Sequence, residues 1–268
     1  MNRKAHFSGS FYPSDPQEIN RYINHFETVA SQHATSILKS EKKLSALVVP
    51  HAGYVYSGFT AHLAFKVLEK ENPKTVFVIG PSHHHYFLGL SIAALDTYET
   101  PLGMLTIDTK LVNVLQEIFT IPYVPDAHDE HSTEVQMPFI KHYCPDAKVV
   151  EIVYGDTKPK EIEPILEYLL NLDDVIIVIS TDLSHFYTLD EAKAKDTKCI
   201  DAFKKLNVKQ LHTGCEACGI LGLEAMMGVA ASKGLQSQLL DYRTSADASD
   251  DRQSVVGYMS GIFTKEGS

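Results

Sequence analysis

The chain has 268 residues, of which 44% are hydrophobic and 22% charged, and its formal net charge is −10. This composition is typical of a folded globular protein, and the acidic balance without a basic block argues against binding to nucleic acid or to an anionic membrane surface. No apolar run approaches the roughly 20 residues of a membrane span, and the N-terminus shows no apolar signal-peptide core. Four cysteines are too few for a disulfide scaffold, so we expect a cytoplasmic protein.

The first part of the chain predicts a helix followed by a strand–helix–strand unit. Residues 14–16, Ser-Asp-Pro, form a helix start, because a short polar side chain caps free amides and proline suits the first turn. Residues 44–50, LSALVVP, and 75–80, TVFVIG, are apolar runs that indicate buried strands. Residues 58–71 between them carry a helical apolar stripe, so the two strands should be parallel.

The remaining chain continues this alternation and ends in strands. We therefore expect an α/β fold, an α/β/α sandwich with a largely parallel or mixed central sheet, formed by one domain spanning residues 1–268. The last two strands should be antiparallel. Further strands are predicted at 90–95, 148–154, 175–186, 237–243 and 254–263, and helices at 108–118, 159–170, 189–206 and 215–232.

Histidines follow three of the predicted buried strands. His51 comes after LVVP, the run His83–His85 after VFVIGPS, and His185 lies in STDLSH. The carboxyl ends of parallel strands face one crevice, so these rings should meet there. Two or three neutral imidazoles with a carboxylate form the ligand set of a mononuclear Fe(II) or Zn(II) site, and Asp182 is a natural ligand or acid–base partner. The alternative is that each histidine is an ordinary loop residue.

Successive side chains in a loop diverge, so one ring of the histidine run should face the crevice. We expect His83 to do so, His84 to lie behind it or face substrate, and His85 to do neither. A second polar cluster, EHSTE, offers Glu130 and His131 as a general acid or base. The alternative is a helix start capped by Ser132 or Thr133, which explains the acidic residues but not His131.

Two further segments carry reactive side chains. Cys215 and Cys218 form a C-x-x-C pattern, which we interpret as a helix start, with Cys218 facing the crevice as the functional alternative. Residues 242–247 end a late strand, and Asp247 there would complete a metal shell or else belong to a solvated turn. The chain lacks the glycine-rich and G-x-S-x-G motifs of P-loop, dinucleotide and serine-hydrolase enzymes.

Four short motifs follow one another along the chain: PHAGY at 50–54, GPSHH at 80–84, EHSTE at 130–134 and STDLSH at 180–185. Together and in this order they resemble the Memo family, which includes the AmmeMemoRadiSam system protein B. The N-terminal GSFYP and the late Cys-Gly pair fit as well, so the resemblance covers nearly the whole chain.

The resemblance implies the fold of class III extradiol dioxygenases of the LigB type, which are non-haem iron enzymes. It implies that His51 and His83 are metal ligands and that Asp182 and His185 line the same pocket. In animal members a cysteine near the end of the Y-x-x-S strand is the third ligand, but residues 242–248 contain none. Asp247 is the nearest carboxylate to that position. We expect the substrate pocket to include His84, Tyr54, Glu134, Cys218 and Arg243.

Three functions follow from these observations and from the resemblance. The first is an oxidoreductase that uses one divalent metal ion, with Fe(II) favoured over Zn or Cu, and a small-molecule or peptide substrate. The second is a metal-assisted hydrolase in which His185 or Glu130 activates water. The third is a non-catalytic scaffold that binds a peptide or a radical SAM or AMMECR-type partner protein. The sequence leaves the formation of a homo-oligomer open.

Overall fold

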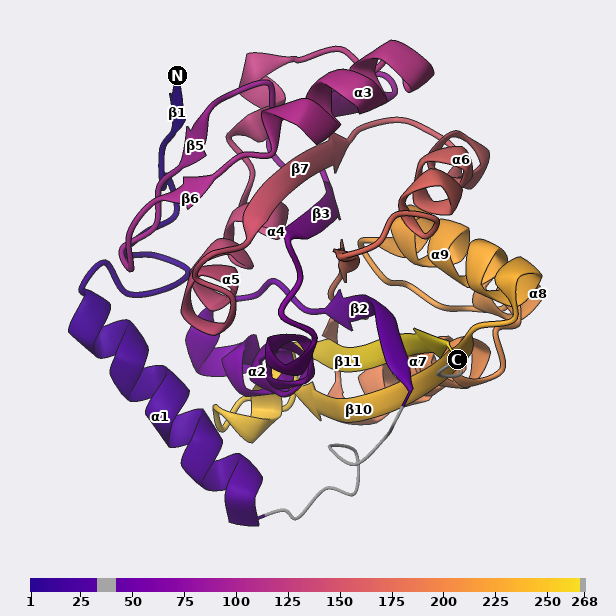
Figure 1. Cartoon of the computed structure of the whole chain (residues 1–268). Coiled ribbons are helices and arrows are strands. Elements are labelled where there is room, and N and C mark those ends of the chain that lie inside the picture. Colours follow the sequence, from indigo (N-terminus) through magenta and orange to yellow (C-terminus); the bar gives the residue numbers. More distant parts are fainter. Residues whose placement is uncertain (33–41, 266–268) are drawn as a thin grey trace.

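The computed structural model of the chain describes residues 1–32 and 42–265 (Figure 1). Strands and helices alternate through most of the chain. In order they are β1 (Asn2–Arg3), α1 (Pro16–Gln32), β2 (Lys43–Val49), α2 (Tyr54–Glu71), β3 (Thr75–Pro81), β4 (Leu90–Ile92), β5 (Thr97–Tyr98), β6 (Leu105–Thr106), α3 (Thr109–Phe119), η2 (Pro125–His128), α4 (His131–Glu134), α5 (Met137–Tyr143), β7 (Lys148–Tyr154), α6 (Pro159–Leu169), β8 (Val175–Ser180), β9 (His185–Tyr187), α7 (Leu189–Lys204), α8 (Val208–Leu211), α9 (Ile220–Lys233), β10 (Gln236–Thr244), η3 (Ser245–Asp247) and β11 (Val255–Lys265).

The main sheet has the strand order β10–β11–β2–β8–β3–β7–β4, and β9 pairs with β11. Strands β2, β8, β3 and β7 run parallel to one another, whereas β4, β10 and β11 pair antiparallel with their neighbours. The predicted mixed sheet with antiparallel C-terminal strands is thus confirmed. Because β8 lies between β2 and β3, the carboxyl ends of these three strands are adjacent.

Helices pack on the main sheet and form an α/β sandwich (Figure 1). Helix α2 packs on β2, β10 and β11, and α1 and α5 pack in turn against α2. Helices α6 and α9 contact each other and β8, while α7 packs on β10 and β11. Every residue of β3 is buried, as its uninterrupted apolar run predicts. The buried sheet therefore gives the loops at its strand ends a rigid base.

Local chemistry explains where several elements begin. The Asp15 carboxylate accepts a hydrogen bond from the Gln17 amide at 3.0 Å, which confirms the predicted start of α1. The predicted cap of α4 was wrong: Glu130, not Ser132 or Thr133, is its N-cap residue and accepts from the Ser132 amide at 2.9 Å. The two hydroxyls are engaged elsewhere, since that of Ser132 donates to the Pro81 carbonyl and that of Thr133 to Glu151.

Several predicted boundaries differ from the structure. The strand predicted over 175–186 is two strands, since β8 ends at Ser180 and β9 covers His185–Tyr187. Strand β4 ends at Ile92 rather than at residue 95. Helix α9 begins at Ile220 rather than at Cys215, because the preceding turn is tied to the end of β8. The Cys218 amide donates to the Asp182 carbonyl at 3.2 Å, and the Gly219 amide donates to the Thr181 hydroxyl at 2.9 Å.

Strand β1 lies in a separate small sheet, in the order β1–β5–β6, which brings the N-terminus beside residues 97–106. Cys199 in α7 forms a disulfide with Cys215, a pairing that the sequence analysis did not anticipate. Within the part of the chain that the structure describes, no helix has both the length and the apolar character of a membrane span.

Candidate functional site

The candidate site lies at the carboxyl ends of β2, β8 and β3. His51 follows β2, His83 follows β3, and Ser180 is the last residue of the intervening β8. The adjacency of these strand ends brings together side chains that are far apart in the sequence. His131, the first residue of α4, joins them from the segment between β6 and β7.

The imidazole of His51 is held from its Nδ1 side. Its Nδ1 lies 2.9 Å from the Ser180 hydroxyl, which itself donates to the Ser132 carbonyl at 2.5 Å. Since the hydroxyl proton is used there, Ser180 accepts from Nδ1–H, and the lone pair lies on the His51 Nε2, which faces the Cys218 thiol. Burial, and then nearby His83, push the pKa of His51 well below its ordinary value, so the ring is neutral.

Glu130 fixes the position of His83. Its carboxylate accepts from the His83 backbone amide at 2.5 Å and lies 3.0 Å from the His83 Nδ1. Burial raises the pKa of Glu130, but hydrogen bonds from His83 and from the Ser132 amide outweigh it and lower that pKa to about 2. The carboxylate is therefore ionised, and a ligand histidine whose Nδ1 faces a carboxylate is a common arrangement at metal sites.

His131 is the third ring of the cluster. Its Nδ1 lies 3.2 Å from Glu130 Oε1 and 2.9 Å from the Nε2 of His84. Its ring stacks on that of Phe11 with a centroid separation of 4.5 Å. Burial, and then the nearby His51, lower the pKa of His131 to about 3, which keeps this imidazole neutral as well.

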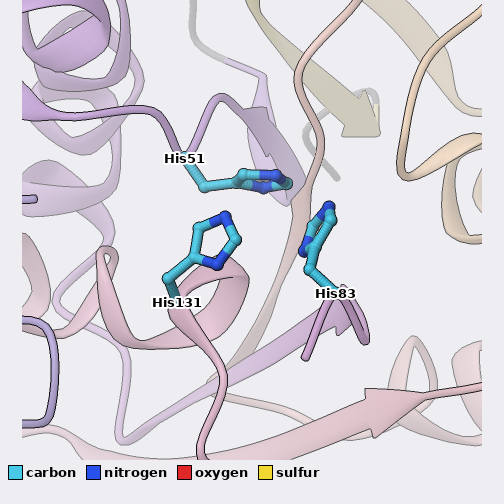
Figure 2. A group of neighbouring side chains, drawn as sticks. All are labelled: His51, His83 and His131. Atoms are coloured by element: carbon cyan, nitrogen blue, oxygen red, sulfur yellow. The ribbon is translucent and has the colours of Figure 1, made fainter. Parts of the chain in front are cut away.

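The three rings converge, as Figure 2 shows. One ligand nitrogen from each of His51, His83 and His131 lies within 4.8 Å of the others, a spacing that one metal ion would bridge. The ring of His83 lies 4.6 Å from that of His131 and 5.2 Å from that of His51, measured between centroids. Neutral imidazoles are good ligands for Zn, Cu, Fe and Ni.

Asp182 and His185 lie beside this cluster. The Asp182 carboxylate accepts from the His51 amide at 2.8 Å, and burial raises its pKa to about 6 despite that bond. His185 is half-buried on β9 and close enough to influence both Asp182 and His51 electrostatically. A buried carboxyl that titrates near neutral pH beside an imidazole is suited to proton transfer.

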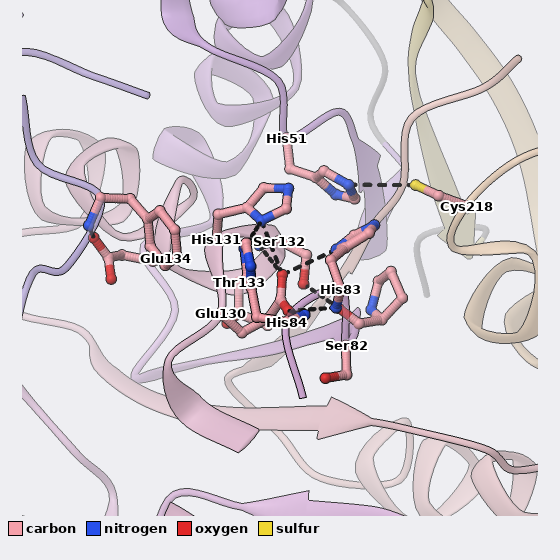
Figure 3. A network of polar contacts seen from close by, with 12 residues as sticks. His51, Ser82, His83, His84, Glu130, His131, Ser132, Thr133, Glu134 and Cys218 are labelled. Atoms are coloured by element: carbon pink, nitrogen blue, oxygen red, sulfur yellow. Dashed lines mark hydrogen bonds and ion pairs between the residues drawn. The ribbon is translucent and has the colours of Figure 1, made fainter. Parts of the chain in front are cut away.

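Cys218 faces the cluster from the turn before α9. Figure 3 shows its Sγ facing the His51 ring. The Sγ lies 3.3 Å from the His51 Nε2 and 3.2 Å from the Asp182 amide nitrogen. Burial raises the pKa of this thiol to about 12. Cys215 and Cys218 do not form a disulfide with each other, because Cys215 is bonded to Cys199. Cys218 therefore keeps its free thiol.

Asp247 and Arg243 are engaged in other contacts. Asp247 lies in the turn η3, where its carboxylate accepts from the amide and the hydroxyl of Thr244 at 2.7 and 3.2 Å. The guanidinium of Arg243 lies over the Phe59 ring at 3.9 Å and contacts the Asp241 carboxylate at 3.2 Å. The structure thus places His131, and not Asp247, beside His51 and His83.

Glu134 anchors the N-terminal arm, residues 3–12, instead of facing the cluster. Its buried carboxylate accepts from Arg3 at 2.8 Å, from the Phe7 amide at 2.7 Å and from the Tyr12 hydroxyl at 2.6 Å. Arg3 also donates to the Glu130 carbonyl at 3.3 Å, so the arm is bound to the segment that carries His131.

The arm then supplies one wall of the site. Phe11 stacks on His131, and Phe7 stacks on the exposed His84 with ring centroids 5.2 Å apart. Tyr54 lies deeper, where its ring stacks on Phe139 and its hydroxyl donates to the Val135 carbonyl at 3.1 Å. Tyr54 therefore supports the loop behind the site.

Comparison with known proteins decides the family. The family model for Memo-like proteins matches residues 3–262 of the chain. The chain belongs to the Memo family. A MEMO1 family protein of Aquifex aeolicus is 34% identical over 97% of the chain and 98% of its own length. MEMO1 family proteins of Archaeoglobus fulgidus and Sulfolobus acidocaldarius are each 31% identical, over 97% and 98% of the chain and 99% of their own lengths.

The motifs that suggested the Memo family each contribute to the cluster. The PHAGY motif supplies His51, GPSHH supplies His83 and His84, and EHSTE supplies Glu130 and His131. The STDLSH motif supplies Ser180 and Asp182, which hold the ring and the backbone amide of His51.

Sequence reasoning missed three contributors to the site. Ser180 sets the orientation of His51, and its place at the end of an apolar run, two residues before Asp182, was an available signal. Phe11 lies within the GSFYP segment, but nothing local indicates that its ring stacks on His131. Arg3 gave no signal, because its partner Glu134 lies 131 residues away in the chain.

Proposed function

We propose that this Memo-family protein is a metal-dependent enzyme in which His51, His83 and His131 hold one divalent metal ion. The observation that carries the proposal is the orientation of the three rings. Each Nδ1 is engaged away from the centre, by Ser180 for His51 and by Glu130 for the other two. Nε2 of each ring is then the nitrogen that would bind a metal, and at His51 the metal would replace the contact with the Cys218 thiol. One ligand nitrogen from each ring lies within 4.8 Å of the others, close enough to share one ion.

We further propose that the metal is Fe(II) and that the reaction is an oxidation related to those of extradiol dioxygenases. The support is the family resemblance and a ligand set of neutral imidazoles, which suits iron and leaves coordination positions open. Bound there, the ion would supply a Lewis-acidic centre for a substrate and O₂.

The protein's own groups would handle protons beside the metal. Asp182 has a pKa near 6 and His185 lies close to it, so these two residues would take up and return a substrate proton. Glu130 would hold His83 and His131 in place and balance part of the metal charge. Phe7 and Phe11 would limit the access of water from the side of the N-terminal arm.

Metal analysis of anaerobically purified protein tests the proposed ligands. We expect about one Fe per chain in the wild type, and loss of that metal in His51→Ala, His83→Ala and His131→Ala. The variants Asp247→Ala and His85→Ala are matched controls that should retain it, since neither side chain lies in the cluster. Full metal content in His131→Ala, or its loss in Asp247→Ala, would contradict the assignment of the third ligand.

A metal-assisted hydrolase is the second candidate, because the cluster of three rings contains no carboxylate. Three histidines with one open position also describe zinc sites that lower the pKa of bound water to about 7. Oxygen uptake with a panel of catechols, measured beside hydrolysis of ester and amide substrates, separates the two candidates. Hydrolysis without oxygen uptake would overturn the oxidoreductase assignment. A metal-loaded chain that does neither but binds an AMMECR-type partner would support the scaffold function.

A further inference from the structure

The ring of His131 has polar partners on both sides. In Figure 3 its Nδ1 points to Glu130 and His84, while the opposite nitrogen points to His51. Two groups of ligand atoms therefore share this ring: His51 and His83 complete one group, and His84 and Glu130 complete the other. In each group the ligand atoms lie within 4.8 Å of one another.

We propose that His84, Glu130 and the Nδ1 of His131 form a second site for a divalent transition-metal ion, bridged to the first by the His131 ring. The bridge rests on the proposed function, because the first ion is the one held by His51 and His83. The second site rests on its own three side chains. Nothing in the resemblance to the Memo family assigns a ligand role to His84.

The distances suit a metal ion with small movements of His84. Its Nε2 lies 2.9 Å from the His131 Nδ1. Two nitrogens bound to one tetrahedral ion at about 2.0–2.1 Å are roughly 3.3 Å apart, so a displacement of a few tenths of an ångström suffices. His84 is exposed and can make this movement, and its exposure also gives the ion a path from solvent.

The charges are also suitable. Glu130 is buried, and its Oε1 lies 3.2 Å from the same Nδ1 of His131. Its carboxylate would be the acidic ligand of a second cation. Two imidazoles with a single carboxylate favour Zn²⁺, Cu²⁺ or Co²⁺ over Mg²⁺ or Ca²⁺, which prefer oxygen ligands.

Proton balance follows from the shared ring. With only the first ion bound through Nε2, the Nδ1 of His131 carries a proton that it shares with Glu130 and His84. When the second ion binds, that N–H bond breaks, the metal–Nδ1 bond forms, and the proton leaves to solvent. The ring then is an imidazolate that joins two ions roughly 6 Å apart, a distance obtained from two metal–nitrogen bonds and the width of the ring.

Zinc titration of the chelator-treated full chain, followed by calorimetry, tests the second site. We expect the wild type to bind two Zn²⁺ per chain and His84→Ala to bind one. His85→Ala is the matched control in the same loop and should bind two. His51→Ala should lose the first ion and retain the second.

The possible outcomes separate the two proposals. One equivalent in both the wild type and His84→Ala, lost in His51→Ala, would overturn the second site and leave the proposed function intact. If the wild type and His51→Ala each bind one Zn²⁺ and His84→Ala binds none, the second site is supported and the first is overturned. No binding by the wild type would overturn both.

Copper provides an independent measurement that a simple His84–His131 hydrogen bond would not affect. Two Cu²⁺ ions joined by an imidazolate couple antiferromagnetically, so the low-temperature EPR intensity of the wild type should fall below that of two spins. His84→Ala should show the full intensity of one spin. Wild-type intensity equal to two independent spins would overturn the bridge.

Discussion

Glu130 connects most of the polar contacts in the candidate site. One carboxylate contacts the rings of His83 and His131 and caps α4 through the Ser132 amide. It is buried, so its ionised form depends on these donors rather than on water. A change at this single residue should therefore alter both the stability of the chain and the geometry of the proposed metal ligands.

We expect Glu130→Gln to lower the free energy of unfolding of metal-free protein at pH 7 by about 2–3 kcal/mol, because charged hydrogen bonds to buried groups are lost. The pKa of Glu130 is depressed from 4.5 to about 2 in the folded state. Its contribution is therefore present above pH 4.5 and lost as the pH falls towards 2. Urea unfolding with chelator at pH 7, 5 and 3.5 should show that the unfolding free energies of wild type and Glu130→Gln converge as the pH falls. A difference in unfolding free energy that stays constant with pH would contradict this account.

At the scale of elements, the site depends on how closely α4 approaches β3. Gly80 lies in β3, and a Cβ built there would be 2.5 Å from the Ser132 hydroxyl and 3.1 Å from the Thr133 methyl. The absence of a side chain at Gly80 thus lets α4 dock against the strand. This docking places His131 beside His83, which follows the same strand.

We expect Gly80→Ala to displace α4, to destabilise the protein by about 1–3 kcal/mol as in other overpacked cores, and to weaken metal binding. Gly228→Ala in α9 is the matched control, because a Cβ there meets only the Glu163 carboxylate at 3.5 Å. A helical glycine replaced by alanine should leave stability unchanged or raise it slightly. Thermal unfolding and metal titration of both variants check this. Equal metal affinity in Gly80→Ala and wild type would show that α4 docking does not set the ligand geometry.

The elements that the sequence predicted well are those whose own residues form an apolar run, because such a run indicates a buried strand. The apolar runs of β2, β3 and β8 predicted that His51, His83 and His185 meet. His51 and His83 do so, whereas His185 lies on β9 beside the cluster. The third ring could not be placed in the same way, because the position of His131 depends on the docking of α4 rather than on a strand end. Asp247 was expected as a ligand from its place in the late segment. Its carboxylate instead accepts a hydrogen bond from the amide of Thr244, three residues earlier.

Interactions between distant segments were harder still to predict. The contact between Arg3 and Glu134 joins residues 131 positions apart, and neither residue type indicates its partner. The disulfide had the same difficulty, since the C-x-x-C pattern was interpreted as a helix start and nothing local indicates that Cys215 pairs with Cys199. Side-chain pairings of this kind are decided by the assembled fold and leave little trace in a single sequence.

At the scale of the whole molecule, the Cys199–Cys215 disulfide joins α7 to the turn that carries Cys218. It closes a loop with a sequence separation of 16 residues. A cross-link over such a loop stabilises the folded state by roughly 3 kcal/mol, mainly because it restricts the unfolded chain.

We therefore expect reduction with dithiothreitol to lower the unfolding free energy of the wild type by about 3 kcal/mol. Cys199→Ala should be less stable than the oxidised wild type and insensitive to dithiothreitol. Urea unfolding with and without the reductant measures both effects. A wild-type stability that does not respond to reduction, while mass spectrometry shows free thiols, would contradict this contribution.

The position of β8 between β2 and β3 also has a consequence for synthesis of the chain. His51 and His83 are translated early, but the strand that separates β2 from β3 ends only at Ser180. A nascent chain that stops before this point has both histidines but lacks the strand that joins β2 to β3 and sets their spacing. Closure of the sheet requires pairing over more than 100 residues, which is a slow step in folding. Binding of the proposed metal should therefore follow, and not guide, the completion of the central sheet.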